Sequence, residues 1–247
     1  LVGWGVTFYL IGALGPAMAA DLGWNPAAVY GGFSAAIVVM AMVSPLAGRA
    51  VDRWGGHRVM PVGAALGALG CALLAAAHAL PLYYLAWAVL GVGMRLCLYD
   101  AAFASLARAA GPAARRPMSQ ITLFGGLAST VMWPVGHALS EWLGWRGAVL
   151  AYAGLALATL PLYLALPRQR YAAKADGKDK MSAGLARNAA ERRLAGVLYA
   201  LIAMLTNFLA AGNAAHLIPL LSGLGLAAAA AVSVAALWGV GQFAARL

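Results

Sequence analysis

Long apolar runs dominate the chain, and short joints rich in glycine, proline and charged residues separate them. Each run is close to the ~20 mostly apolar residues that a helix needs to cross the hydrocarbon core of a bilayer. The short alternating segments expected of membrane β-strands are not evident. The pattern therefore predicts eight transmembrane helices, over Leu1–Ala20, Ala28–Ala47, Met60–His78, Leu82–Ala104, Ser119–Glu141, Gly147–Leu166, Leu194–Ile218 and Leu224–Ala245.

The composition excludes a water-soluble domain. Hydrophobic residues make up 64% of the 247 positions and charged residues only 10%, whereas a soluble domain is about half apolar and about one quarter charged. A soluble fold cannot hide this excess of apolar surface, but a bilayer accepts it. The expected fold class is therefore an all-α transmembrane helical bundle whose surroundings are the lipid bilayer.

The formal charge of +10 reflects topology rather than a nucleic-acid partner, because the basic residues are confined to a few joints. Cytoplasmic joints carry the excess of Lys and Arg in membrane proteins. The joints between helices 2 and 3, 4 and 5, and 6 and 7 are therefore expected in the cytoplasm, in a multi-pass protein of the cell membrane (the inner membrane of a bacterium). Fourteen basic residues lie in these joints, against Arg146 alone on the other side: Arg49, Arg53, Arg58, Arg108, Arg115, Arg116, Arg168, Arg170, Lys174, Lys178, Lys180, Arg187, Arg192 and Arg193.

One joint is much longer and more polar than the others, and it divides the chain. Residues 167–193 are expected to form a flexible cytoplasmic linker. Residues 1–166 before it would be a six-helix bundle, and residues 194–247 after it would be the first two helices of a second bundle. We expect a duplicated architecture of about twelve helices, of which this sequence lacks the N-terminal flank and the last four.

The joint between helices 2 and 3 carries the most specific motif of the chain. It reads Gly48-Arg49-Ala50-Val51-Asp52-Arg53-Trp54-Gly55-Gly56-His57-Arg58. This segment resembles the signature loop of the major facilitator superfamily, G-x-x-x-D-R-x-G-x-[RK]-[RK], at Gly48, Asp52, Arg53, Gly55 and Arg58. The five residues are expected to form a conformational gate rather than to contact substrate. Gly48 would permit close helix approach, Gly55 a tight reversal, and Asp52 a pair with a neighbouring Arg.

The resemblance implies two helix bundles that rock about a binding site at the middle of the membrane. The turn Gly144-Trp145-Arg146 further resembles bacterial relatives of the monocarboxylate porters. The patterns of proton-coupled drug antiporters fit less well. Trp87 stands where their fourth helix often has Arg, and Ser129 and Trp133 stand where their fifth helix has glycines.

Polar groups inside the predicted helices are the candidates for substrate or coupling contacts, since an ionisable residue there costs about 2.5–3.5 kcal/mol on insertion scales. Arg95 lies about 20 Å down the fourth helix at the helical rise. It could bind a carboxylate or oxyanion, or it could be structural and pair with Asp100 or backbone carbonyls. Asp100 could carry a coupling proton or pair with the basic residues of the signature loop. Asn207, near the midplane of the seventh helix, could bind substrate or tie helices together.

Several function classes remain open at this point. The leading one is a secondary active transporter that moves a small solute, an organic anion or monocarboxylate, by alternating access, with a proton as a possible coupling ion. An efflux transporter for a drug or toxic oxyanion is the alternative. A receptor or structural bundle is a third class. No enzyme, metal or cofactor is expected, since the His, Cys and acidic residues show no catalytic or metal-ligand spacing.

Overall fold

The computed structural model describes residues 1–171 and 188–246, and every regular element among them is a helix. The expected all-α fold is confirmed. Residues 172–187, the core of the expected linker with Lys174, Lys178, Lys180 and Arg187, lie outside the described residues. The elements are η1 (Trp4–Phe8, a π-helical turn), α1 (Leu10–Leu22), α2 (Pro26–Trp54), α3 (Gly56–Ala75), α4 (Leu80–Cys97), α5 (Tyr99–Ala110), η2 (Gly111–Ala114, a 3-10 turn), α6 (Arg115–Gly126), α7 (Ala128–Ala158), α8 (Leu160–Leu164), α9 (Ala189–Gly223) and α10 (Ala228–Ala244).

The joints use the local chemistry that ends and starts helices. α1 ends at Gly23, whose φ of 64° is left-handed and suits a residue without a Cβ. The side chain of Asn25 then accepts a hydrogen bond from the backbone N–H of Ala27 at 2.8 Å, which caps α2. Pro26 at the first helical position needs no N–H partner. The chain therefore reverses within a few residues and starts its second crossing.

Within residues 1–171 and 188–246, five helical stretches are long and apolar enough to cross a membrane: Trp4–Leu22, Pro26–Trp54, Gly56–Ala75, Leu80–Leu164 and Ala190–Gly223. The fourth contains 85 residues, far more than one crossing requires. It is divided where the backbone leaves the helical region, at Leu98 and Gly111 and at Gly144. α10 is apolar but shorter.

Several helix boundaries differ from the hydrophobic pattern. The run 82–104 is broken at Leu98, between α4 and α5, and the run 119–141 is interrupted at Leu127, between α6 and α7. The runs 119–141 and 147–166 are instead joined in α7, where Gly144 (φ 68°, ψ 168°) marks the reversal between them. α9 begins at Ala189, inside the expected linker, because the Asn188 side chain accepts a hydrogen bond from the backbone N–H of Glu191 at 2.8 Å.

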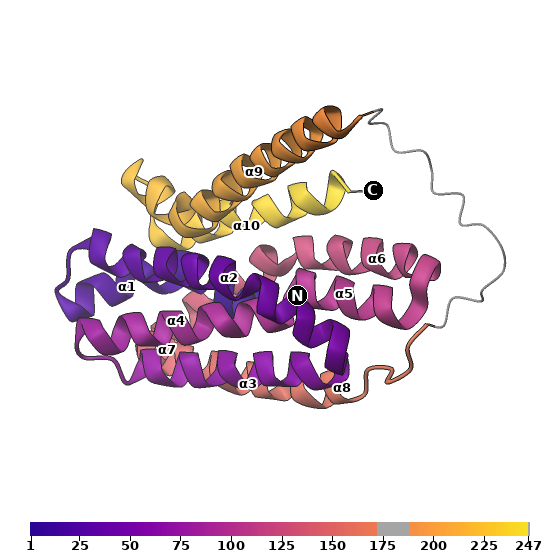
Figure 1. The fold of residues 1–247 in the computed structure, drawn as a ribbon. Coiled ribbons are helices and arrows are strands. Elements are labelled where there is room, and N and C mark those ends of the chain that lie inside the picture. Colours follow the sequence, from indigo (N-terminus) through magenta and orange to yellow (C-terminus); the bar gives the residue numbers. More distant parts are fainter. Residues whose placement is uncertain (172–187, 247) are drawn as a thin grey trace.

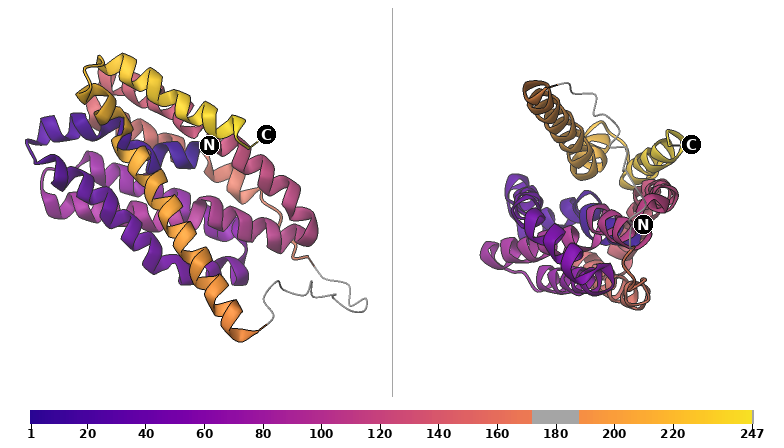
Figure 2. Two further views of the ribbon diagram at one scale, coloured as in Figure 1. Left: turned by 90° about the horizontal axis from the view of Figure 1, so that it is seen from above. Right: turned by 45° about the vertical axis from the view of Figure 1, so that its right-hand side comes forward.

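The helices up to α8 pack into one bundle, and α9 and α10 lie together along one side of it (Figure 1; Figure 2, right). α3 packs against both α4 and α7, while α1 packs against α7 and α9, and α10 packs against α6, α7 and α9. Large side chains fill the bundle, among them Trp87, Trp133, Tyr83 and Tyr152, each fully buried. Most of the α9 surface is exposed.

The odd and even joints gather at opposite ends of the bundle. At one end, the Arg146 guanidinium pairs with Asp21 and donates a hydrogen bond to the carbonyl of Ala77 at 2.9 Å, which ties the joints after the first, third and fifth crossings. At the other end, Gly55, Arg108 and Pro167 line one cavity and thereby bring together the joints after the second, fourth and sixth. The charge-rich joints therefore share one face.

Candidate functional site

The two glycines of the signature turn are positioned by close packing against α5. Gly55 has a φ of 79°, which L side chains rarely adopt. A Cβ on Gly55 would lie 2.6 Å from Nη1 of Arg108, and a Cβ on Gly56 would collide with the Ser105 hydroxyl. The tight reversal expected at Gly55 is present in the structure.

Gly48 plays a different part from the one expected of it. No neighbouring heavy atom lies within 4 Å of the position that a Cβ would take, so no close helix approach depends on it here. Gly48 instead borders a cavity of about 280 Å³ that it shares with Ser44, Arg95 and Asp100. The small residue leaves this cavity open rather than bringing two helices together.

The charged residues of the signature turn are exposed and unpaired with one another. Asp52, Arg53 and Arg58 all lie at the surface, and the Arg53 guanidinium lies over the Trp54 ring at 5.6 Å. Within residues 1–171 and 188–246, Asp52 forms no ion pair. The expected Asp52–Arg pair is therefore not formed among the described residues.

A break in the fourth crossing brings Arg95 and Asp100 together. Leu98 is extended (φ −84°, ψ −162°), so α4 ends at Cys97 and α5 restarts at Tyr99. Nη1 of Arg95 donates to Oδ2 of Asp100 at 2.5 Å, and Nη2 donates to the Ser44 hydroxyl on α2 at 2.5 Å. On one continuous helix, side chains five residues apart point about 140° from each other. The break removes that separation.

The geometry of the ion pair helps to choose between the roles that the sequence left open for Arg95 and Asp100. The Arg95 side chain is 22% exposed and that of Asp100 is 62% exposed. Both terminal nitrogens of Arg95 have partners, and its charge is balanced by Asp100. Arg95 therefore has the partner that its structural role requires. Asp100 pairs with Arg95 rather than with the basic residues of the signature loop.

Asn207 is not brought to the other candidates. Its side chain is exposed on α9, and its amide nitrogen donates to the carbonyl of Ala203 at 2.8 Å, one turn earlier in the same helix. In this arrangement Asn207 ties no two helices together and faces neither Arg95 nor Asp100.

A second polar cluster, which sequence reasoning missed, joins the first bundle to α10. The Gln242 side chain lies near the Tyr9 hydroxyl, and the Arg246 side chain lies near the Tyr99 hydroxyl and donates to Oε1 of Gln242 at 3.4 Å. Arg246 also donates to the carbonyl of Thr122, which accepts a bond from the Tyr99 hydroxyl at 3.4 Å. Tyr9, Tyr99 and Thr122 come from the first bundle, whereas Gln242 and Arg246 come from the last described helix and its end.

Aromatic packing positions the two tyrosines. Tyr99 lies against Trp4 with ring centroids 4.7 Å apart. Tyr9 meets Trp133 edge to face at 5.4 Å, and the Trp133 indole N–H donates to the Tyr9 carbonyl at 3.1 Å. Edge-to-face contacts of this kind stabilise a defined ring orientation. The hydroxyls are therefore presented to α10 by rigid neighbours.

Arg246 stands out because its guanidinium reaches from the end of α10 to the first bundle. Its side chain is exposed, and the described part of the chain contains no ion pair to it. The sequence offers one signal for this residue: Ala244-Ala245-Arg246 repeats, near the end of the chain, the Ala47-Gly48-Arg49 that precedes the signature turn. Position alone does not reveal that Arg246 reaches Tyr99.

The same part of the chain offers no metal centre. Among residues 1–171 and 188–246, no three His, Cys, Asp or Glu side chains lie close enough to hold a metal ion. Cys71 and Cys97 are both free thiols in buried positions.

Comparison with known proteins gives a consistent result. A family model described as Major Facilitator Superfamily matches residues 2–247. Multidrug resistance protein MdtL of Klebsiella pneumoniae (strain 342) is 31% identical over 154 residues, which cover 61% of this chain and 38% of that relative. No solved structure matches the chain.

Proposed function

Because the chain belongs to the major facilitator superfamily, we propose that it acts in a secondary transporter that moves a small organic anion across the membrane by alternating access. The family consists of transporters rather than enzymes. The observation that carries the anion proposal is the guanidinium of Arg246, which donates to the Thr122 carbonyl beside Tyr99 where α10 meets the first bundle and forms no ion pair within residues 1–171 and 188–246. A guanidinium can hold a carboxylate with two parallel hydrogen bonds.

The position of Arg246 suits alternating access. Transporters of duplicated architecture bind substrate between their two repeats, and rocking of the repeats opens the site to each side in turn. We take residues 1–166 as one repeat and the helices after 193 as the start of the other. A substrate carboxylate would contact the second repeat through Arg246 and the first repeat through Tyr9 and Tyr99.

Arg246 replaces Arg95 as our anion-binding residue. The Arg95 charge is balanced by Asp100 and its terminal nitrogens are occupied, so an incoming anion would have to displace an existing pair. Asp100 becomes the residue for a coupling proton, because its carboxylate is 62% exposed beside the cavity that Gly48 borders. Protonation of Asp100 would release Arg95 and let α2 and α5 separate.

The test is uptake and efflux of labelled small monocarboxylates by cells that express the full-length protein. Arg246→Gln and Arg246→Lys are both expected to reduce transport at least about tenfold, because charge-assisted hydrogen bonds are worth about 1.5–3 kcal/mol and Lys cannot bind in two-point fashion. Arg49→Gln, the counterpart on α2, is the control. Unchanged transport in the Arg246→Gln variant would contradict the assignment of Arg246 as the anion-binding residue.

Efflux of a drug is the second proposal, and the match to Multidrug resistance protein MdtL favours it. In that case expression should raise the drug concentration that inhibits growth of a sensitive host, and no monocarboxylate should move. Under either substrate, the joints rich in Lys and Arg are proposed to face the cytoplasm of a bacterial inner membrane.

A further inference from the structure

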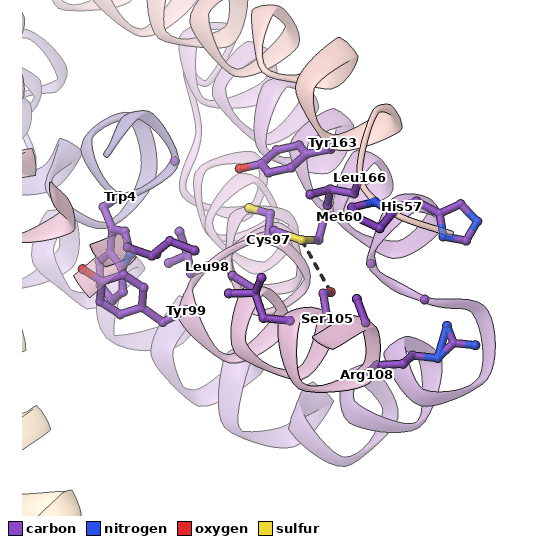
Figure 3. A pocket seen from close by; sticks show the side chains of 18 of the residues that line it. Trp4, His57, Met60, Cys97, Leu98, Tyr99, Ser105, Arg108, Tyr163 and Leu166 are labelled. Atoms are coloured by element: carbon purple, nitrogen blue, oxygen red, sulfur yellow. Dashed lines mark hydrogen bonds between the residues drawn. The ribbon is translucent and has the colours of Figure 1, made fainter. Parts of the chain in front are cut away.

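A cavity of about 240 Å³ lies inside the first bundle at the end that carries the signature turn (Figure 3). It touches the Arg246 cluster only at Tyr99, which lines its far end, and it shares no lining residue with the cavity beside Gly48. The start of α3, the length of α5 and the end of α8 form its walls. The walls are mostly apolar, with Met60, Leu98, Ala102, Leu106, Tyr163 and Leu166 among the lining residues.

One end of this cavity is cationic. Figure 3 shows His57 and Arg108 together on the side opposite Trp4 and Tyr99. Nη1 of Arg108 and Nδ1 of His57 lie 2.6 and 3.0 Å from the single point where a Cβ of Gly55 would be. The two basic groups therefore converge above the signature turn.

These groups lack partners. Nδ1 of His57 and Nε of Arg108 are buried without a hydrogen bond to any described residue. Neither side chain is in an ion pair within residues 1–171 and 188–246. The charges that act on His57 are those of Arg58, Arg108 and Arg168, all of them positive.

Buried basic side chains without partners are unfavourable unless a ligand supplies hydrogen bonds and negative charge. Buried polar atoms are almost always hydrogen-bonded in folded proteins, and here burial and the charges of the neighbouring arginines lower the pKa of His57, while no described residue compensates the positive charge of Arg108. An anion between His57 and Arg108 would accept the missing hydrogen bonds and balance the charge. The apolar walls behind would accept hydrocarbon, since burying it is favourable.

We propose that this cavity binds an amphipathic anion, with its carboxylate or phosphate between His57 and Arg108 and its acyl chain against Met60 and Tyr163. Basic pockets between membrane helices at the cytoplasmic side are suited to anionic lipid headgroups. Two sources share this chemistry: an anionic phospholipid of the bilayer and a free fatty acid from the aqueous phase. The anionic group would lie at the end opposite Tyr99, the one residue that this cavity shares with the proposed substrate site.

The first experiment measures binding to the full-length protein in phosphatidylcholine nanodiscs. One arm adds phosphatidylglycerol to the bilayer, another adds decanoate from solution, and a third adds decan-1-ol, which has the same tail as decanoate without the charge. We expect one or both anions to bind, and the combined His57→Gln and Arg108→Gln variant to weaken that binding at least about tenfold. Arg53→Gln, at the same joint but outside the cavity, should bind like the unaltered protein.

A second measurement keeps the proposal testable if the double variant folds poorly. Cys97 lines the cavity, whereas Cys71 does not. In a Cys71→Ala background, the bound anion should slow the reaction of Cys97 with a small maleimide several-fold, and glycerol phosphate, which has no tail, should not. Equal binding of decanol and decanoate, an equal loss in Arg53→Gln, or no protection of Cys97 would each overturn the proposal.

Discussion

Gly55 passes so close beneath Arg108 that a single added carbon would lie 2.6 Å from the guanidinium. The backbone there is left-handed as well, with φ at 79°. The signature turn thus needs a glycine at this position for two independent reasons, conformation and space. Gly48, seven residues earlier in the same motif, meets neither condition in this structure.

Gly55→Ala and Gly48→Ala therefore form a matched pair. An alanine at positive φ costs about 1–2 kcal/mol, and at Gly55 it must also displace Arg108, so Gly55→Ala should lower the unfolding temperature in detergent and reduce transport. Gly48→Ala adds a methyl group facing open space within α2 and should leave stability unchanged or raise it by up to about 1 kcal/mol. Equal losses in the two variants would contradict the packing described here.

The Arg95–Asp100 pair predicts an asymmetric double-mutant cycle. Asp100→Asn leaves the less exposed Arg95 uncompensated, which costs about 2.5–3.5 kcal/mol on insertion scales. Arg95→Gln leaves an Asp100 carboxylate that is already 62% exposed and should be milder. The Arg95→Gln, Asp100→Asn double variant should recover most of the folded protein seen in size-exclusion chromatography.

The double variant also tests the coupling role of Asp100. Substrate exchange between the two sides of the membrane should continue. Accumulation driven by a pH gradient should be lost, since position 100 no longer has the carboxylate that is proposed to carry the proton. Retained uphill transport would rule out Asp100 as the coupling group. Failure of the double variant to fold better than Asp100→Asn would instead contradict the ion pair itself.

Arg146 holds three joints together at the end opposite the signature turn. Its guanidinium pairs with Asp21 and donates to the Ala77 carbonyl at 2.9 Å, and the Trp145 indole N–H donates to the same Asp21 carboxylate at 2.9 Å. Arg146→Gln should lower the unfolding temperature by a few degrees. Exposed Arg116 at the other end serves as the control, and Arg116→Gln should change the temperature little.

The hydroxyl of Tyr99 is predicted to contribute to substrate affinity because it donates to the same Thr122 carbonyl as Arg246. Tyr99→Phe removes only the hydroxyl and retains the ring that packs against Trp4. A neutral hydrogen bond is worth about 0.5–1.5 kcal/mol, so the KM for uptake should rise about two- to tenfold with little change in stability. An unaltered KM would place the substrate elsewhere.

Cysteine accessibility tests the proposed orientation. In a background without Cys71 and Cys97, Trp142→Cys should react with a membrane-impermeant maleimide added outside intact cells, because Trp142 is 84% exposed near the Arg146 end. Arg116→Cys, which is exposed near the signature-turn end, should react only after the cells are permeabilised. The reverse pattern would invert the topology predicted from the Lys and Arg counts.

Much of this protein could be predicted without coordinates. The cost of placing each residue in hydrocarbon is largely a local property, so hydropathy alone identified the membrane runs and the all-α class. The signature turn was also predictable, since Gly55 and Gly56 are required by backbone geometry and close packing at a short reversal. Each predicted helix crosses the membrane once. Counting the helices was therefore enough to place the joints after odd-numbered helices at one end of the bundle and the joints after even-numbered helices at the other.

The polar contacts were decided by tertiary structure. Leu98 carries no glycine or proline signal, yet the break there turns Asp100 toward Arg95, which a continuous helix would not allow. Arg246 is far from Tyr99 in sequence, and only the docking of α10 against the first bundle joins them. Hydropathy is summed residue by residue along the chain, whereas an ion pair or a binding site depends on where separate helices place their side chains in space.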